Sequence, residues 1–382
     1  MNSMKTTNNW RFLHNKFLQI SCIQKLLVFS LSVLLTLFML EILLHLCWSP
    51  KQIYQNLWYY PEINKKHYQY IFLDIFSNHK YDCPNFDAEL GWDNKTPATQ
   101  FRGRNIIKDK APGVERILFI GDSYTRGNEV KKWETFPYYV SKILPNKEIL
   151  NMGVSGYGID QTFLKFTSGG INYSPDMVFF GINPSNYERA SLDFTYAAKP
   201  KFILDKITGE IHLLNNTILS PQESFQQIKS DLGLTLFLNG FVKSRISKIP
   251  SIRKRCQESF TNRMDTIVQQ ILMNLKTISA SHNIKPYIIH IPGGHVFKDK
   301  DSLLNHQQAV LYQHLLQIYG ATDIPYIDLQ KEFLSRYELS EIYNTFYFHR
   351  TNKSIGHFTP KGNQAAANII LDKAFDIQIK VH

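Results

Sequence analysis

A serine, a histidine and a group of glycines and asparagines in this sequence have the chemistry that acyl transfer needs. Ser123 follows an apolar run at residues 116–120, which predicts a buried strand that breaks at Gly121. Side chains at the carboxyl ends of strands lie where open α/β sheets bind their ligands. A serine hydroxyl is a poor nucleophile until a base removes its proton. The sequence must therefore also provide a base and hydrogen-bond donors for an oxyanion.

His357 is the candidate base, because imidazole accepts a proton near neutral pH. It lies in a turn at residues 356–363, which leads into an alanine-rich helical segment at residues 364–371. A loop in that position can reach back over the edge of a sheet. An exposed loop histidine is the alternative, since the chain has 13 histidines.

Two more segments contain candidate oxyanion donors. Residues 151–161 follow a second predicted strand, and their glycines allow a backbone N–H to approach a substrate closely. Residues 176–186 predict a third strand that ends in two asparagines, Asn183 and Asn186. An asparagine amide at a strand end can donate a hydrogen bond to a developing oxyanion.

Together these segments resemble the SGNH (GDSL-type) hydrolase family, which is named for a serine, a glycine, an asparagine and a histidine in four sequence blocks. The Gly-Asp-Ser triplet that ends at Ser123 is similar to the first block and implies that this serine is the nucleophile. The Asn-x-Gly-x-x-Gly run that ends at Gly156 is similar to the second block and implies that this glycine donates to the oxyanion. His357 matches the histidine of the last block.

The resemblance covers residues 86–372 and is close to a membrane-anchored bacterial branch of that family. The branch has a Phe-x-x-Glu-Leu-Gly-Trp signature, found here at residues 86–92, and a Gly-Tyr-Gly-x-Asp-Gln signature, found at residues 156–161. The resemblance implies a doubly wound parallel sheet and an ester substrate. It also implies an oxyanion site made of the backbone N–H groups of Ser123 and Gly156 with one asparagine amide.

The third block departs from the family pattern. It normally reads Gly-x-Asn-Asp, or Gly-Asn-Asp in this branch, whereas the chain has Gly-Ile-Asn-Pro-Ser-Asn at residues 181–186. Asn186 is favoured as the oxyanion asparagine because of its distance from Asp176, and Asn183 is the alternative because it keeps the glycine two residues before it.

The aspartate that the family usually places two or three residues before the histidine is also missing, because Ser354 and Ile355 stand there. In the chymotrypsin-type triad, losing this partner lowers turnover about 10⁴-fold. The family includes exceptions in which a backbone carbonyl orients the imidazole. Ser354 and Asp122 are kept as possible supporting residues, although Asp122 is expected mainly to bond backbone amides in its own turn.

The N-terminal segment predicts a membrane anchor. Residues 26–48 form an apolar run long enough to cross a bilayer, and it contains Glu41 and His45 one helical turn apart. These two side chains can pair with each other or reach the interface, and contact with a partner helix is the alternative. Residues 1–25 carry four basic side chains and no acidic one. The positive-inside rule therefore places them in the cytoplasm and the rest of the chain outside, in a periplasm or extracellular.

Composition excludes some other classes. The net charge is +11, from 43 basic and 32 acidic residues, but no nucleic-acid-binding motif accompanies it. The most basic stretch, residues 243–255, is consistent with lipid headgroups, an acidic glycan or simply a solvated face. No cofactor is expected. His290, His295 and His349 lack the spacing of a metal site, so no metal is expected either.

The remaining pattern predicts one α/β domain over residues 86–382, behind a connector at residues 49–85 that is aromatic-rich and irregular. The expected strands lie near residues 116–121, 148–154, 176–183, 286–291 and 325–329, and the expected helices near 135–144, 159–168, 261–281, 304–319 and 361–375. This alternation predicts a doubly wound parallel sheet of about five strands.

Residues 190–260 interrupt the alternation and are expected to form an insertion over the active-site edge, with a hairpin at residues 202–214. Outside the membrane, Cys83 and Cys256 are a possible disulfide pair. The sequence thus predicts a membrane-anchored serine esterase for O-acyl esters of cell-surface glycans. An O-acetyltransferase of the same fold, a lipid esterase and a non-catalytic glycan-binding or assembly subunit are the alternatives, and protein partners are unknown.

Overall fold

A five-stranded parallel sheet with strand order β11-β10-β7-β5-β6 forms the centre of the domain, as predicted. The computed structural model describes residues 5–49, 53–54, 57–78, 85–94, 100–101, 104–105, 109–214, 218–233, 237–350 and 355–379. The strands of the sheet are β5 (Glu115–Ile120), β6 (Lys147–Asn151), β7 (Met177–Ile182), β10 (Lys285–His290) and β11 (Tyr326–Asp328).

The sequence of β5 shows why the sheet is buried on both faces. Leu118 and Ile120 pack into one hydrophobic core, and Ile117 and Phe119 pack into a second core on the opposite face. All four side chains are fully buried. Successive side chains of a strand point to opposite faces, so a continuous apolar run fits a parallel sheet that is covered on both sides.

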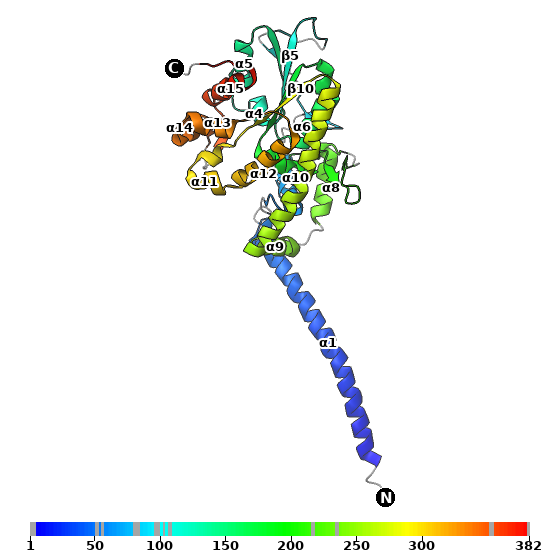
Figure 1. The fold of residues 1–382 in the computed structure, drawn as a ribbon. Coiled ribbons are helices and arrows are strands. Elements are labelled where there is room, and N and C mark those ends of the chain that lie inside the picture. The colour runs from blue at the N-terminus through cyan, green and yellow to red at the C-terminus, as the bar shows by residue number, and fades with distance from the viewer. Residues whose placement is uncertain are drawn as a thin grey trace.

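Helices cover both faces of this sheet (Figure 1). One core contains side chains of α6 (Ile159–Lys165), α7 (Pro184–Ala190), α10 (Pro250–Ser281) and α12 (Gln307–Thr322). The other contains side chains of α5 (Phe136–Ile143), α13 (Leu329–Arg336), α14 (Leu339–Thr345) and α15 (Pro360–Phe375). The remaining helices are α1 (Lys5–Cys47), α3 (Pro61–Ser77), α4 (Ser123–Arg126), α8 (Pro221–Gly233), α9 (Phe237–Ile246) and α11 (Lys300–Asn305).

Within the described residues, four small antiparallel strand pairs lie outside this sheet. They are β1 (Asn85–Asp87) with β2 (Gly91–Asp93), β3 (Gln100–Phe101) with β4 (Arg104–Asn105), β8 (Phe202–Leu204) with β9 (Ile211–Leu213), and β12 (Tyr347–His349) with β13 (Ile355–Phe358). The β8–β9 pair confirms the predicted hairpin. The β12–β13 pair was not predicted, and it places His357 on a strand rather than on a loop.

Some predicted boundaries were wrong. The connector is not irregular throughout, because α3 forms 17 residues of it and buries Ile63 and Phe72. The helix expected at residues 261–281 begins at Pro250, and the one expected at residues 304–319 is two helices, α11 and α12. Proline at the first helical position is favourable, since its missing N–H has no partner there in any helix.

The predicted insertion consists of separate pieces, and only its first part lies at the active-site edge. Tyr196 packs over Gly156 there, as described below. The β8–β9 hairpin instead packs on α10, where the Gln270 amide donates to the Gly209 carbonyl oxygen at 2.6 Å. Helix α8 packs on α3, and α9 packs on α1. Most of the insertion therefore fills the end of the domain from which α1 leaves.

Helix α1 projects from the domain as a long isolated rod (Figure 1). Its segment Ile23–Cys47 contains an 18-residue window with a mean hydropathy of 2.5 and is long and apolar enough to cross a membrane. The predicted pairing of Glu41 with His45 is confirmed, with 3.1 Å between Oε1 and Nε2. Near its end, Leu44 is only 2% exposed and belongs to the core of the domain.

Candidate active site

The turn after β5 holds Ser123 at the carboxyl edge of the sheet. Asp122 caps the short helix α4, because its Oδ1 accepts a hydrogen bond from the backbone N–H of Tyr124 at 3.0 Å. Ser123 is the first residue of that helix and is 6% exposed. The structural role expected for Asp122, bonding an amide in its own turn, is confirmed.

His357 and Ser123 lie in hydrogen-bond contact, with 2.8 Å between His357 Nε2 and Ser123 Oγ. The imidazole comes from β13, which pairs with β12 and ends just before α15. The ring of Tyr124 packs edge-on against the imidazole, with 4.9 Å between ring centroids. The fold thus brings together a hydroxyl and an imidazole that are 234 residues apart in the chain.

Glu129 occupies the place of the missing aspartate behind the imidazole. Its Oε2 lies 2.7 Å from His357 Nδ1 and also accepts the backbone N–H of His357 at 2.8 Å. Its Oε1 accepts a hydrogen bond from Arg350 Nε at 2.7 Å. Ser354, the other expected support, lies outside the described residues.

The charge of Glu129 determines which nitrogen of His357 carries the hydrogen. The hydrogen bond from Arg350, with those from His357, lowers the pKa of Glu129 to about 2 against the opposing effect of burial. An ionised carboxylate only accepts hydrogen bonds, so Nδ1 must be the protonated nitrogen and Nε2 is free to accept the hydroxyl hydrogen of Ser123. The Nη2 atom of Arg350 is 3.4 Å from Nδ1, too far to compete with the carboxylate.

The backbone at Glu129 is strained. Its φ is +70°, in the left-handed region that residues other than glycine rarely adopt. Such a conformation costs on the order of 1–3 kcal/mol and persists where the surroundings hold it. The bonds to Arg350 and His357 provide that restraint. Sequence reasoning missed Glu129 because an acidic residue six positions after the serine, among 32 acidic residues, has no distinguishing local pattern.

Gly156 has a backbone conformation and surroundings that only glycine fits well. Its φ is +82°, and an added Cβ would lie 2.7 Å from ring carbons of Tyr196. Among the described residues, no group accepts a hydrogen bond from the backbone N–H of Gly156 or of Ser123. These two donors are therefore available to a ligand at the sheet edge.

The two asparagines of the third block are engaged in the protein itself. The Asn186 amide nitrogen donates to Asp122 Oδ2 at 2.9 Å and to the Tyr157 carbonyl oxygen at 2.8 Å, which uses both of its hydrogens. The Asn183 amide donates to the Ile291 carbonyl oxygen at 2.9 Å. In this conformation Asn186 fixes Asp122 and the glycine loop, which differs from the expectation that its amide faces an oxyanion.

The β1–β2 hairpin clamps the loop that contains Gly156. Trp92 Nε1 donates to the Ser155 carbonyl oxygen at 2.9 Å, and the Tyr157 hydroxyl donates to the Trp92 carbonyl oxygen at 2.6 Å. The Gln161 amide donates to the Leu90 carbonyl oxygen at 2.8 Å. The two sequence signatures at residues 86–92 and 156–161 are therefore one structural unit.

The rim of the site is aromatic and basic. Tyr196 is 50% exposed, and Arg126 is exposed with its Nη1 donating to Ser155 Oγ at 2.9 Å. Lys199 holds the Tyr196 segment in place, because its buried ammonium donates to Asp160 Oδ2 at 2.5 Å. The first part of the insertion is thus fixed against the start of α6.

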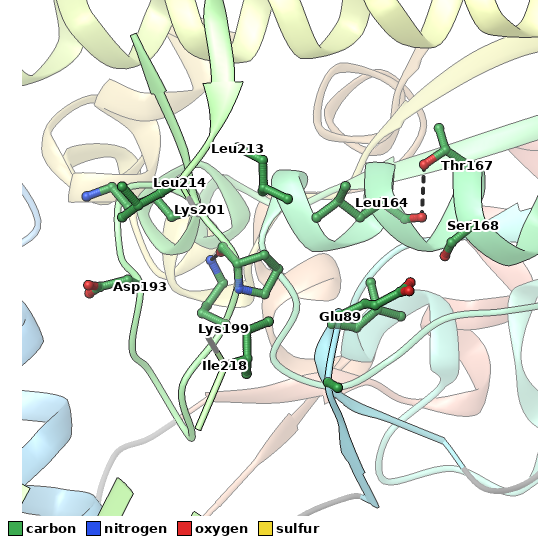
Figure 2. Close-up of a pocket in the computed structure, with 13 residues that line it drawn as sticks. Glu89, Leu164, Thr167, Ser168, Asp193, Lys199, Lys201, Leu213, Leu214 and Ile218 are labelled. Carbon is green, nitrogen blue, oxygen red and sulfur yellow. Dashed lines mark hydrogen bonds between the residues drawn. The ribbon is translucent and has the colours of Figure 1, made fainter. Parts of the chain in front are cut away.

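Other candidate sites lie apart from this edge. A cavity of about 470 Å³ opens between β1–β2, α6 and the insertion, and its lining includes Glu89, Ser168 and Lys201 but neither Ser123 nor His357 (Figure 2). Within the described ranges, no group of three or more His, Cys, Asp or Glu side chains is arranged to hold a metal ion. Cys256 is half-buried, and its proposed partner Cys83 lies outside those ranges, so the disulfide stays a prediction.

Comparison with known proteins gives weak similarities. The sequence matches no family model and no curated protein. An acetylxylan esterase from Geobacillus stearothermophilus is 12% identical, with a TM-score of 0.40 over 72% of this chain and 100% of that one. A candidate lipolytic protein of the G-D-S-L family from Desulfitobacterium hafniense is 11% identical, with a TM-score of 0.36 over 66% of this chain and 96% of that one. Similarity at this level identifies no function, so the side chains at the sheet edge must carry the assignment.

Proposed function

We propose that this protein is a serine esterase of the SGNH type in which Ser123 is the nucleophile, His357 the general base and Glu129 the residue that orients the base. One observation carries the proposal: the Oγ–Nε2 contact of 2.8 Å continues, through the same imidazole, into the Nδ1–carboxylate contact of 2.7 Å. This is the arrangement of nucleophile, base and orienting acid that activates a serine.

The reaction follows from these contacts. His357 Nε2 takes the hydroxyl proton as Ser123 Oγ bonds to the ester carbonyl carbon, and Glu129 stabilises the imidazolium that results. The backbone N–H groups of Ser123 and Gly156 donate to the oxyanion. The imidazolium then protonates the leaving alcohol as the ester C–O bond breaks, which leaves Ser123 acylated. A water molecule or an acceptor hydroxyl, deprotonated by the same imidazole, removes the acyl group and restores Ser123.

The membrane placement is part of the proposal. Residues 26–48 would cross the bilayer with residues 1–25 in the cytoplasm, so that the esterase domain faces the periplasm or the cell exterior. The substrate class that fits this placement is an O-acetyl ester of a cell-surface glycan. The half-exposed ring of Tyr196 next to Gly156 supports it, because an aromatic face can pack against a sugar ring.

The missing aspartate and the altered third block both favour the alternative of a non-catalytic subunit. Glu129 provides an acid behind His357, so only the third block still favours that alternative. Hydrolysis and transfer to a sugar hydroxyl both proceed through the same acyl-enzyme.

Hydrolysis of p-nitrophenyl acetate by the full chain in detergent tests the assignment. Ser123→Ala should abolish the activity, whereas Ser185→Ala should retain it, because the Ser185 hydroxyl bonds Gln308 and no histidine. Unchanged activity in Ser123→Ala would exclude this serine as the nucleophile. A preference for long-chain acyl esters would favour a lipid esterase, and an acetylated product formed only with an added glycan would favour the transferase.

A further inference from the structure

Helix α9 begins directly on the outer end of α1. The Glu41 carboxylate accepts the backbone N–H groups of Phe237 and Leu238, the first two residues of α9, at 2.5 and 2.8 Å. The His45 ring stacks on Phe237 with 3.8 Å between ring centroids. A carboxylate at a helix N-terminus satisfies free N–H groups and opposes the helix dipole. Figure 1 shows α9 lying across the end of the domain from which α1 leaves.

This contact fixes the level of α9 relative to a bilayer. Residues 23–40 are the part of the apolar segment that precedes Glu41, and eighteen helical residues span roughly 27 Å. That length is close to the hydrocarbon thickness of a membrane. Of residues 26–48, which are proposed above to cross the bilayer and on which this inference rests, the part from Glu41 onward packs on the domain through Glu41 and Leu44. Glu41 and the start of α9 therefore lie at the outer interface.

The exposed surface of this region carries both apolar and basic side chains. Val242 and Ile246 are one turn apart on α9, and Ile249 follows in the turn to α10; their exposed fractions are 42%, 44% and 47%. Residues 242–255 contain six basic side chains and no acidic one. The basic side chains are Lys243, Arg245, Lys248, Arg253, Lys254 and Arg255. Apolar side chains flanked by basic ones are typical of a helix that lies in the plane of a membrane surface.

We propose that α9 and the turn to α10 form a membrane-docking surface, which inserts Val242, Ile246 and Ile249 below the headgroups and places the basic side chains on anionic phospholipid. A purely ionic partner such as an acidic glycan would explain the basic residues but not the exposed apolar row. Continuity with α1 also favours the bilayer, because Glu41 near the outer end of α1 accepts the first backbone N–H groups of α9. The domain is then held at two places and keeps one orientation on the membrane.

Site-specific quenching tests the proposal. Single cysteines are introduced into a cysteine-free full-length chain as Ile246→Cys, Leu34→Cys and Ile207→Cys, labelled with a fluorophore, and reconstituted in vesicles that contain nitroxide-labelled lipid. Leu34 lies within α1, and Ile207 is 96% exposed at the tip of the β8–β9 hairpin. We expect strong quenching at positions 34 and 246 and little at position 207. Quenching at position 34 without quenching at position 246 overturns the docking surface, and its absence at position 34 overturns the anchoring itself.

The charge requirement is tested in vesicles of phosphatidylcholine with or without phosphatidylglycerol. Quenching at position 246 should increase with phosphatidylglycerol, and the triple change Lys243→Glu, Arg245→Glu and Lys248→Glu should abolish that increase. Equal quenching in both lipids overturns the headgroup contact. Amide hydrogen exchange at residues 242–249 of the unmodified chain compares the same two kinds of vesicle without substitutions. Protection of these amides by a soluble polyanionic glycan but not by phosphatidylglycerol would overturn the proposal in favour of a glycan site.

Discussion

Two carboxylates at opposite functional regions of the molecule are bonded in similar ways. Glu129 at the sheet edge and Glu41 at the end of α1 each accept a backbone N–H from a segment about two hundred residues away, and each contacts a histidine. The difference lies on the far side of the imidazole. His357 presents its other nitrogen to Ser123, whereas the ring of His45 stacks on Phe237.

This comparison teaches that an acid–histidine pair is not by itself a catalytic signal. At the sheet edge the carboxylate selects the tautomer that leaves Nε2 able to accept a proton from a neighbouring hydroxyl. At the end of α1 the carboxylate caps the start of α9, and among the described residues no hydroxyl contacts the His45 ring. The same Glu→Gln substitution should therefore lower kcat strongly at the sheet edge and leave kcat unchanged at the end of α1.

Glu129→Gln should have the largest effect. A glutamine amide can donate to Nδ1 and so favours the tautomer with its hydrogen on Nε2, which cannot accept the proton of Ser123. In the chymotrypsin-type triad the corresponding change lowers turnover about 10⁴-fold, and we expect a fall of about 10³–10⁴-fold in kcat here. Steady-state hydrolysis of p-nitrophenyl acetate measures it.

Glu134→Gln is the matched control, because Glu134 bonds the backbone N–H of Lys131 nearby and does not contact His357. Melting curves of both variants should show that the fold is retained. If Glu129→Gln kept nearly full activity while Ser123→Ala had none, another group would have to orient the imidazole.

Gly156→Ala should lower kcat by about 10²–10³-fold, the usual cost of losing one oxyanion donor. The added methyl meets the Tyr196 ring, and the φ of +82° is unfavourable for alanine, so the N–H shifts away from the substrate oxygen. The KM for a small ester should change little. The double variant Gly156→Ala with Tyr196→Ala removes the clash but not the backbone strain. Full recovery of kcat in that double variant would show that glycine is needed only for space.

His290 extends the comparison to a histidine that has no bonded carboxylate. It is fully buried, and burial lowers its pKa to about 4, partly offset by the charge of Asp328. Because the unfolded chain binds this proton more tightly, stability should be full above about pH 6.5 and fall as the pH decreases toward about 4. The loss amounts to about 3 kcal/mol.

Urea unfolding at about pH 7 and about pH 4.5 measures this pH dependence. His290→Phe should flatten it, and His282→Gln, at an exposed position, should leave it unchanged. The prediction fails if His290→Phe and the unmodified chain lose stability equally on acidification. A carboxylate bonded to His290 would stabilise the charged imidazole, and the free energy of unfolding would then increase as the pH decreases.

Local sequence patterns predict the sheet and two of the three residues of the site, but not the contacts between distant segments. The apolar runs gave the five parallel strands, because a strand buried on both faces must be almost continuously hydrophobic. Ser123 and His357 were found because glycine-rich turns and a helix start flank them in recognisable order. Glu129 was not found, because its role depends on a contact with a segment 228 residues away and on a left-handed backbone that no local pattern indicates. The capping of α9 by Glu41 was missed for the same reason, at a sequence separation of 196 residues.

Glu41→Gln should have the smallest effect and should leave catalysis intact. A neutral side chain still accepts one hydrogen bond, but it loses the second and the favourable interaction with the dipole of α9, at a cost of about 1 kcal/mol. We therefore expect the amides of Phe237 and Leu238 to exchange roughly fivefold faster, while kcat on p-nitrophenyl acetate stays unchanged. Glu62→Gln is the control at the same end of the domain, because Glu62 pairs with Lys243 while 75% exposed. If Glu41→Gln reduced kcat as strongly as Glu129→Gln does, the two regions would be coupled, and the membrane end would have to be counted as part of the catalytic apparatus.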